Sequence, residues 1–258
     1  MTYIIAVSNE KGGVAKTTST LSIGAALVES GQEILLVDLD PQANLTLALG
    51  IQPAQIRRSV ADLLLGNTSI LSVSRETSVP GLDIIPASGE MLLVERFLYV
   101  RQNYEHLLRK ALAKANMYNM VLLDCPPSLG ALTINALTAS NLLIIPTQCE
   151  FFSAHSLREM LDLIRNIRQR SNPSLRYRVM ITMLGKTRVH RTLQEQIRTA
   201  FGSAVFSTAI ENDTKLRECP VVGKPITEYA PESRAAQQYR ALAQELEEYV
   251  HQAIAQPA

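Results

Sequence analysis

The sequence predicts an α/β fold, in which a mostly parallel, twisted β-sheet is covered by helices on both faces. Short runs rich in Ile, Val and Leu alternate with longer stretches whose apolar residues recur at helical spacing. Such alternation is typical of parallel strands joined by crossover helices. The 258 residues contain no internal repeat and no long Gly, Pro or Ser linker. We therefore expect a single domain over residues 1–258.

Each element follows from a local pattern. The apolar runs predict strands at residues 3–7, 34–37, 82–85, 120–123, 142–145 and 179–183, with a weaker one at 206–210. The helical spacing predicts helices at residues 17–29, 91–115, 129–139, 156–169 and 192–201, and a closing C-terminal helix at about 233–255. Ligands of such sheets bind beyond the carboxyl ends of the strands, so we expect the site there.

The composition excludes several classes of protein. It is 47% hydrophobic and 19% charged, as in globular proteins, and no apolar run is long enough to cross a bilayer. The three cysteines are widely spaced and form no C-x-x-C pair, which argues against a zinc ribbon or an iron–sulfur carrier. We expect reduced thiols in a cytoplasm, and we interpret Cys125 as a packing residue.

The loop at residues 9–18, Asn-Glu-Lys-Gly-Gly-Val-Ala-Lys-Thr-Thr, lies between a predicted strand and a predicted helix. A glycine-bearing loop that opens a helix presents backbone N–H groups and a partial positive charge to an anion. Lys16 supplies a full charge for phosphates, and Thr17 supplies a hydroxyl ligand for Mg²⁺. The loop departs from the ordinary P-loop pattern at both glycines and carries a second lysine, Lys11.

This variant resembles the deviant Walker A loop of the ParA/MinD family of ATPases, in the form typical of small ParA partition ATPases. The matching residues are Lys11, Gly12, Gly13, Lys16, Thr17 and Thr18. The resemblance implies ATP and Mg²⁺ as cofactors, a P-loop NTPase fold, and nucleotide contacts that include Val14 and Ala15. It also implies that Lys16 binds the phosphates of its own subunit, whereas Lys11 reaches the nucleotide of the partner in a homodimer. Ala15 replaces the family's usual glycine, and its methyl restricts the loop's dihedral angles.

Two further segments end predicted strands with carboxylates. Asp38 and Asp40 lie two residues apart in a strand, so they share one side. The segment resembles the family's D-x-D-P-Q motif, which implies that Asp40 positions the attacking water and helps bind the metal; two turn residues at a strand end are the alternative. Asp124 begins a segment that resembles the family's D-x-P-P motif, in which this aspartate orients the Mg²⁺ shell.

Later segments carry the remaining resemblance. Glu150 follows a predicted strand where the family's partner subunit approaches, and an exposed glutamate is an equally good interpretation. Residues 182–186 and 210–220 resemble segments that border adenine and bind DNA. Asp213 stands where the family has an adenine-contacting Asn. The residues expected to contact the DNA backbone are Lys186, Arg188, Arg191 and Lys215.

The charge distribution agrees with a local polyanion-binding face. The net charge is only +1, yet residues 158–217 contain 12 basic and five acidic residues. A solvated helix face is the alternative. Because few aromatic residues accompany these cations, we expect salt-sensitive binding that is independent of DNA sequence.

The resemblance therefore implies a slow, cytoplasmic, nucleoid-associated ATPase that segregates or positions cargo. The resemblance implies a dimer that forms around ATP, binds non-specific DNA and is stimulated by a ParB-like protein or cargo adaptor. One alternative is the same mechanism acting on a protein cargo, such as a carboxysome or a chemotaxis cluster. A MinD-like membrane ATPase would need a basic amphipathic C-terminal helix, but no Lys or Arg follows Arg240. A metabolic ATPase of the same superfamily is the third alternative.

Overall fold

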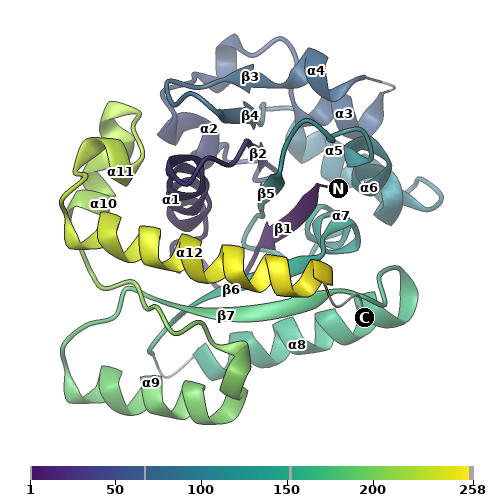
Figure 1. The fold of residues 1–258 in the computed structure, drawn as a ribbon. Helices are drawn as coiled ribbons and strands as arrows, with labels where there is room; N and C mark the ends of the chain where they lie inside the picture. The colour runs from purple at the N-terminus through teal and green to yellow at the C-terminus, as the bar shows by residue number, and fades with distance from the viewer. Residues whose placement is uncertain (1, 67, 151–152, 256–258) are drawn as a thin grey trace.

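A computed structural model describes residues 2–66, 68–150 and 153–255 (Figure 1). It contains one seven-stranded sheet with the order β3-β4-β2-β5-β1-β6-β7. The strands are β1 (Tyr3–Val7), β2 (Ile34–Asp38), β3 (Arg75–Glu76), β4 (Leu82–Ile85), β5 (Met120–Asp124), β6 (Leu142–Gln148) and β7 (Arg176–Thr182). All neighbouring strands pair in parallel except β3, which is antiparallel to β4. The predicted fold class is confirmed.

Helices cover both faces of this sheet, and each face has its own buried core. One face packs against α1 (Lys16–Glu29), α2 (Asn44–Ala48) and α12 (Arg234–Ala255), with α12 lying alongside α1 (Figure 1). The other face packs against α3 (Val60–Leu65), α4 (Ile70–Val73), α5 (Met91–Leu98), α6 (Leu107–Leu112), α7 (Ala131–Ala139) and α8 (Ser153–Arg170). Because β1, β2 and β5 are covered on both sides, β1 is apolar throughout, and β2 and β5 are apolar until their terminal aspartates.

The remaining elements are peripheral. The helix α9 (Arg188–Phe201) packs Leu193, Ile197 and Phe201 against the core but contains no buried residue, and Figure 1 draws it at the lower left of the molecule. The short helices near the C-terminal part are α10 (Lys215–Glu218) and α11 (Ile226–Tyr229). Single turns of 3-10 helix occur at η1 (Pro53–Gln55), η2 (Tyr104–His106), η3 (Gly202–Ala204) and η4 (Cys219–Val222).

Two sequence predictions are wrong. The helix expected over residues 91–115 is interrupted, since α5 ends at Leu98 and the chain resumes helical structure only at η2. Asn103 at the break has a φ of 54°, in the left-handed region that no continuous right-handed helix tolerates. The weak strand at residues 206–210 is absent. Its neighbours Val205 and Glu211 form isolated bridges to Val179 and Leu184, so the segment touches the sheet edge without joining it.

The connections create a switch point between β1 and β5. From β1 the chain crosses through α1 to β2, whereas from β5 it crosses through α7 to β6 in the opposite direction. The two helices lie on opposite faces of the sheet. Such a reversal opens a crevice at the carboxyl ends of the strands. The predicted phosphate loop leaves β1 at this edge, and Asp124 ends β5 at the same edge.

Candidate functional site

The loop between β1 and α1 has an unusual backbone. Gly13 has a φ of 74°, and Ala15, directly before the helix, has φ 66° and ψ 33°. The first value suits glycine, which pays no steric penalty there. The second is costly for alanine, because its Cβ crowds the following carbonyl. The sequence departure at position 15 therefore falls on a residue whose backbone is strained.

Three side chains, one from the loop itself and two from distant strands, hold this loop by its carbonyl groups. The Lys16 ammonium donates to the Lys11 carbonyl at 3.0 Å, the Gln148 amide donates to the Gly13 carbonyl at 3.0 Å, and the Thr182 hydroxyl donates to the Val14 carbonyl at 3.1 Å. The Ala15 carbonyl accepts the Ser19 N–H at 2.9 Å. With its carbonyls engaged in this way, the loop is fixed in one conformation.

The backbone N–H groups of the loop are left free. Within the described residues, none of the N–H groups from Gly12 to Thr18 donates a hydrogen bond to the protein. The last three open α1, where the helix dipole adds a partial positive charge. A row of seven free donors at a helix N-terminus is a binding site for a phosphate chain.

This row faces a cavity of about 520 Å³. Its polar wall is formed by the loop and Asp40, and its apolar wall comes from α1, α2 and the η4 region. The lining residues are Gly12, Gly13, Ala15, Lys16, Thr17, Thr18, Leu21, Ser22, Asp40, Asn44, Leu47, Ala48, Pro127, Met183, Cys219 and Pro220. A site with one phosphate-binding wall and one apolar wall suits a nucleotide.

Strand register brings the buried carboxylates together. In the sheet, Asp124 of β5 pairs with Val7 of β1 on one side and with Asp38 of β2 on the other. Asp124 is fully buried and accepts hydrogen bonds from Thr17 at 2.7 Å and Thr20 at 3.3 Å. Burial, followed by the charge of Asp38, raises the pKa of Asp124 well above its usual value.

Asp38 holds the loop that follows β2. Its carboxylate accepts the Thr46 N–H at 2.9 Å and the Thr46 hydroxyl at 2.7 Å, and it also accepts the Asp40 N–H at 3.1 Å. Burial raises the pKa of Asp38 to about 6, although these hydrogen bonds oppose the shift. Asp40 instead lines the cavity, where one of its oxygens accepts the Gln42 N–H at 2.9 Å. The two aspartates therefore have different tasks: Asp38 fixes the segment, and Asp40 faces the cavity.

The charges around the cavity suit a divalent cation bound with a polyanion. Three carboxylates, those of Asp38, Asp40 and Asp124, are buried here, and the Lys16 ammonium is buried near Asp124 and Asp40. Burial lowers the pKa of Lys16, and the nearby Asp124 counteracts this. Among the described residues, no cluster of three or more His, Cys, Asp or Glu side chains could hold a metal ion alone. Since Mg²⁺ prefers few protein ligands with phosphate oxygens and water, Thr17 with nearby aspartates fits that ion.

Lys11 is held by its own chain. Its ammonium lies 2.5 Å from a Glu150 carboxylate oxygen and 3.3 Å from the Gln148 side-chain oxygen, both from the segment at the end of β6. The lysine side chain is 24% exposed and the glutamate side chain is 50% exposed. Such an exposed pair contributes little, about 0–1 kcal/mol, so Lys11 can exchange this partner for another anion.

Asp213 lies outside the main cavity. It lines a neighbouring cavity of about 70 Å³ that shares Ala15, Thr18 and Met183 with the larger one. The carboxylate accepts the Lys215 N–H at 3.1 Å, which fixes the start of α10. An adenine contact by Asp213 stays a prediction.

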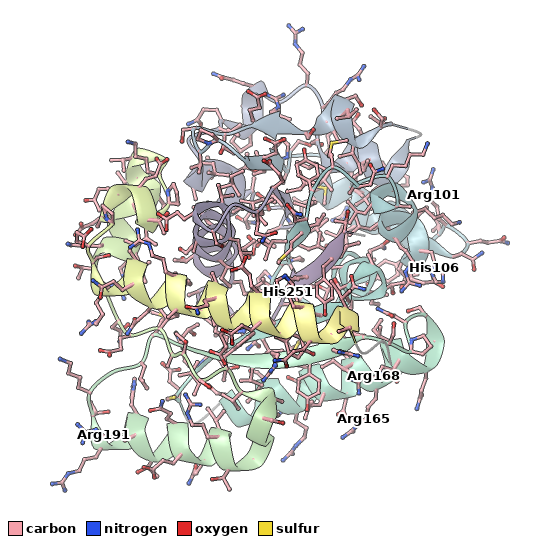
Figure 2. The ribbon with its side chains drawn as sticks, viewed as in Figure 1. Arg101, His106, Arg165, Arg168, Arg191 and His251 are labelled. Carbon is pink, nitrogen blue, oxygen red and sulfur yellow. The ribbon has the colours of Figure 1, made fainter. Side chains whose placement is uncertain are left out.

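The predicted DNA-binding residues are all exposed. Lys186, Arg188 and Arg191 lie in the β7–α9 connection and the first turn of α9, and Figure 2 shows Arg191 extending from that helix away from the body. Lys215 begins α10. The bridge between Leu184 and Glu211 joins the two segments that carry these residues.

Cys125 is fully buried, and burial raises the pKa of its thiol. This agrees with the interpretation of Cys125 as a packing residue, because a nucleophile requires the thiolate. Sequence reasoning missed Gln148 and Thr182, which reach the site from distant strands, and Thr46, which lies eight residues after Asp38. It also missed Asn9, whose side chain bonds the Pro146 carbonyl and the Lys11 N–H. Only Asn9, inside the recognised loop, could have been found by its position.

Comparisons with known proteins agree with this geometry. A family model described as an AAA domain matches residues 2–177. The sporulation initiation inhibitor protein Soj of Bacillus subtilis is 40% identical over 249 residues, which span 95% of this chain and 98% of Soj. The chromosome partitioning protein ParA of Caulobacter vibrioides is 38% identical over 251 residues, which span 94% of this chain and 93% of ParA.

A solved structure also resembles this chain along most of its length. Cobyrinic acid a,c-diamide synthase from Mycobacterium smegmatis, with bound ATP analogue and magnesium, has a TM-score of 0.83 and 35% identity, and the match covers 95% of this chain and 93% of the synthase.

Proposed function

This chain belongs to the ParA/Soj family of AAA-domain ATPases, and we propose that it pairs two copies around ATP, binds DNA without sequence preference and positions a cargo. The observation that carries the proposal is the row of free N–H groups from Gly12 to Thr18 above the cavity. In this proposal residues 1–258 form one ATPase domain.

ATP binding and hydrolysis use the polar wall of the cavity. The loop N–H groups and Lys16 bind the phosphates, while Thr17 and Asp124 would hold a Mg²⁺ ion, which would neutralise charge on the phosphate chain. Asp40, the carboxylate on the cavity wall, would orient the attacking water and help bind the metal. Asp213 borders the base from the smaller cavity.

Dimerisation depends on Lys11. In the single chain this lysine is neutralised by Glu150, and we propose that a partner's ATP replaces that carboxylate. A nucleotide phosphate carries more charge than a carboxylate, so it displaces Glu150 from Lys11 once the second copy is in place. In the single chain, Glu150, which was expected where the partner subunit approaches, contacts its own Lys11 instead.

DNA binding uses Lys186, Arg188, Arg191 and Lys215, which lie on two neighbouring exposed segments. Two copies would join their cationic segments into one surface, and the salt-sensitive binding would hold the protein on the nucleoid in the cytoplasm. A ParB-like protein or cargo adaptor would stimulate the slow hydrolysis and release the DNA. Plasmid or chromosome partition and positioning of a protein cargo share this mechanism.

A MinD-like membrane role is disfavoured by α12. Its apolar side chains, from Ala235 through Tyr239 and Leu246 to Val250, are buried against the sheet and α1. A membrane-binding helix would need that face free. Among the described residues, no helix combines the length and apolarity that spanning a bilayer requires.

A metabolic role is the second candidate, because one structural relative is named as a synthase. The matches to Soj and ParA are more similar in sequence, which favours partition. An ATP-dependent gel shift on random DNA separates the two roles: a partition ATPase retards the DNA, whereas inert behaviour with ATP and Mg²⁺ would favour the synthase class.

The main experiment measures dimerisation. Light scattering should show the hydrolysis-deficient Asp40→Ala variant as a dimer with Mg·ATP and as a monomer with ADP. Lys11→Ala should bind ATP yet remain monomeric. A variant that replaces Lys186, Arg188 and Lys215 with Ala should dimerise but lose DNA affinity. A strictly monomeric Asp40→Ala variant at saturating Mg·ATP would overturn the proposal.

A further inference from the structure

A second groove lies away from the nucleotide site. It has a volume of about 830 Å³ and is formed by the C-terminal end of α3, by α4 and by α6. The lining residues are Leu63, Leu64, Leu65, Gly66, Thr68, Ser69, Ile70, Leu71, Arg101, Leu107, Lys110, Ala111, Lys114 and Met117. The proposed ATPase mechanism uses none of them.

One wall of this groove is apolar and partly open to solvent. Leu63, Leu64 and Ile70 are buried at its base. Above them, Leu71 is 68% exposed, Met117 is 44% exposed and Leu65 is 37% exposed. Large apolar side chains that stay exposed around one depression are typical of an interaction site.

The groove also has cationic side chains in its lining. Lys110 and Lys114 lie four residues apart, Lys110 within α6 and Lys114 just beyond its end, and Arg101 stands at the edge of the groove. Arg101 uses part of its guanidinium to bond the Leu64 and Leu65 carbonyls at the end of α3. Within the described residues, neither lysine makes a side-chain hydrogen bond or an ion pair, and no Asp or Glu lines the groove. Like charges at this spacing repel each other unless an anion lies between them.

We propose that this groove binds an acidic, amphipathic helical segment of a partner protein. The apolar face of such a helix covers Leu65, Leu71 and Met117, and carboxylates on its flank pair with Lys110 and Lys114, whose one-turn spacing matches Glu residues at i and i+4. A nucleic acid would satisfy the lysines, but its phosphates would leave the apolar wall exposed. The observations therefore favour a protein segment.

The groove lies near the amino ends of the central strands, and the nucleotide site lies at their carboxyl ends. The Thr2 hydroxyl, just before β1, donates to the Ala115 and Tyr118 carbonyls, so the groove residues Lys114 and Met117 lie near the amino end of β1. The phosphate loop leaves the other end of this five-residue strand, about 17 Å away. Figure 2 likewise shows Arg101 and Arg191 on opposite sides of the molecule. A partner in the groove therefore leaves the nucleotide cavity and the predicted DNA-binding residues accessible.

The test uses the full chain without nucleotide, so that it does not depend on the proposed ATPase function. The probe is a fluorescent peptide of about 16 residues, or about 24 Å of helix, with Leu on one face and Glu on the flanks. Wild-type protein should bind it with an affinity that falls as salt rises. A matched peptide with Lys in place of Glu should not bind.

Two groove variants and one control variant locate the binding site. Lys110→Glu with Lys114→Glu should weaken peptide binding at least about tenfold, and Leu71→Ser should weaken it about threefold. The control, Arg58→Glu with Lys224→Glu, makes the same charge change at exposed residues outside the groove and should bind within twofold of wild type. Thermal unfolding checks that all variants fold, which is expected since each replaced residue is exposed.

Three results would overturn the proposal. One is no binding of the acidic peptide by folded wild-type protein. Another is equal binding by the Lys110/Lys114 variant. The third is that the acidic peptide does not bind at all while the Lys110/Lys114 variant loses random duplex DNA binding. That result would assign the cationic side chains of the groove to nucleic acid. Peptide binding in a protein that fails to dimerise with ATP would leave this inference intact and remove only the proposed function.

Discussion

Replacing Ala15 with glycine should stabilise the protein, although Ala→Gly changes usually do the opposite. Ala15 has a φ of 66° and a ψ of 33°. A left-handed conformation costs a non-glycine residue about 1–2 kcal/mol. Glycine removes that cost but gains freedom in the unfolded chain, which offsets about 0.5–1 kcal/mol. The net gain is about 0.5–1 kcal/mol, or about 1–4 °C in Tm for a chain of this size.

The matched control is Ala241→Gly, on the exposed side of α12. There the backbone is helical, so glycine should lower the free energy of unfolding by about 1 kcal/mol. The same chemical change should thus have opposite signs at the two positions. Urea and thermal unfolding without nucleotide measure both effects, and an ATP titration of Ala15→Gly should give an affinity within a few-fold of wild type.

The contradicting result is that Ala15→Gly destabilises the protein as much as Ala241→Gly does. That result would mean that the loop relaxes at no cost around the methyl group of Ala15, so that the left-handed backbone stores no strain.

Three other predictions follow from the carboxylates. Thr46→Val removes the hydroxyl bonded to Asp38 and should lower the free energy of unfolding in urea by about 3 kcal/mol. Thr46→Ser keeps the hydroxyl and should lower it by only about 1 kcal/mol. Equal losses in the two variants would contradict the role of the hydrogen bond. The unfolded chain loses the Asp38 proton near pH 4 and the folded chain near pH 6, so the free energy of unfolding should fall by on the order of 3 kcal/mol as the pH rises from 4 to 6. Asp38→Asn should reduce this slope, and a slope unchanged by that substitution would count against the raised pKa. Asp40→Ala should lower phosphate release by about 100-fold or more and leave ATP affinity within threefold, and equal turnover would remove its assignment.

Long buried elements were predictable from the sequence, and short or interrupted ones were not. Central strands such as β2 and β5 are continuous apolar runs ending in Asp, a pattern that the sequence alone marks as a buried strand. The region from α2 to β3 contains elements of only two to six residues, which are too short to show a helical or strand periodicity. In the wrongly predicted helix, apolar spacing continues past Leu98, and neither Gly nor Pro marks the break at Asn103.

The candidate site divides in the same way. Lys16, Thr17 and Asp40 could be predicted because each belongs to a contiguous motif, and the structure brings them onto one cavity. Gln148 and Thr182 hold the phosphate loop from β6 and β7, more than 130 residues away in the chain. No local pattern encodes such contacts, because they depend on which strands become neighbours.

The pairing of Asp124 with Val7 and Asp38 limits how the chain can change in length during evolution. Neighbouring residues of a strand point to opposite faces of the sheet, so a deletion of one residue just before β5 would move Cys125 into the place of Asp124. Every core side chain of the strand would change face at the same time. Insertions and deletions should therefore accumulate in the peripheral connections, while the spacing between the central strands and their terminal aspartates stays fixed.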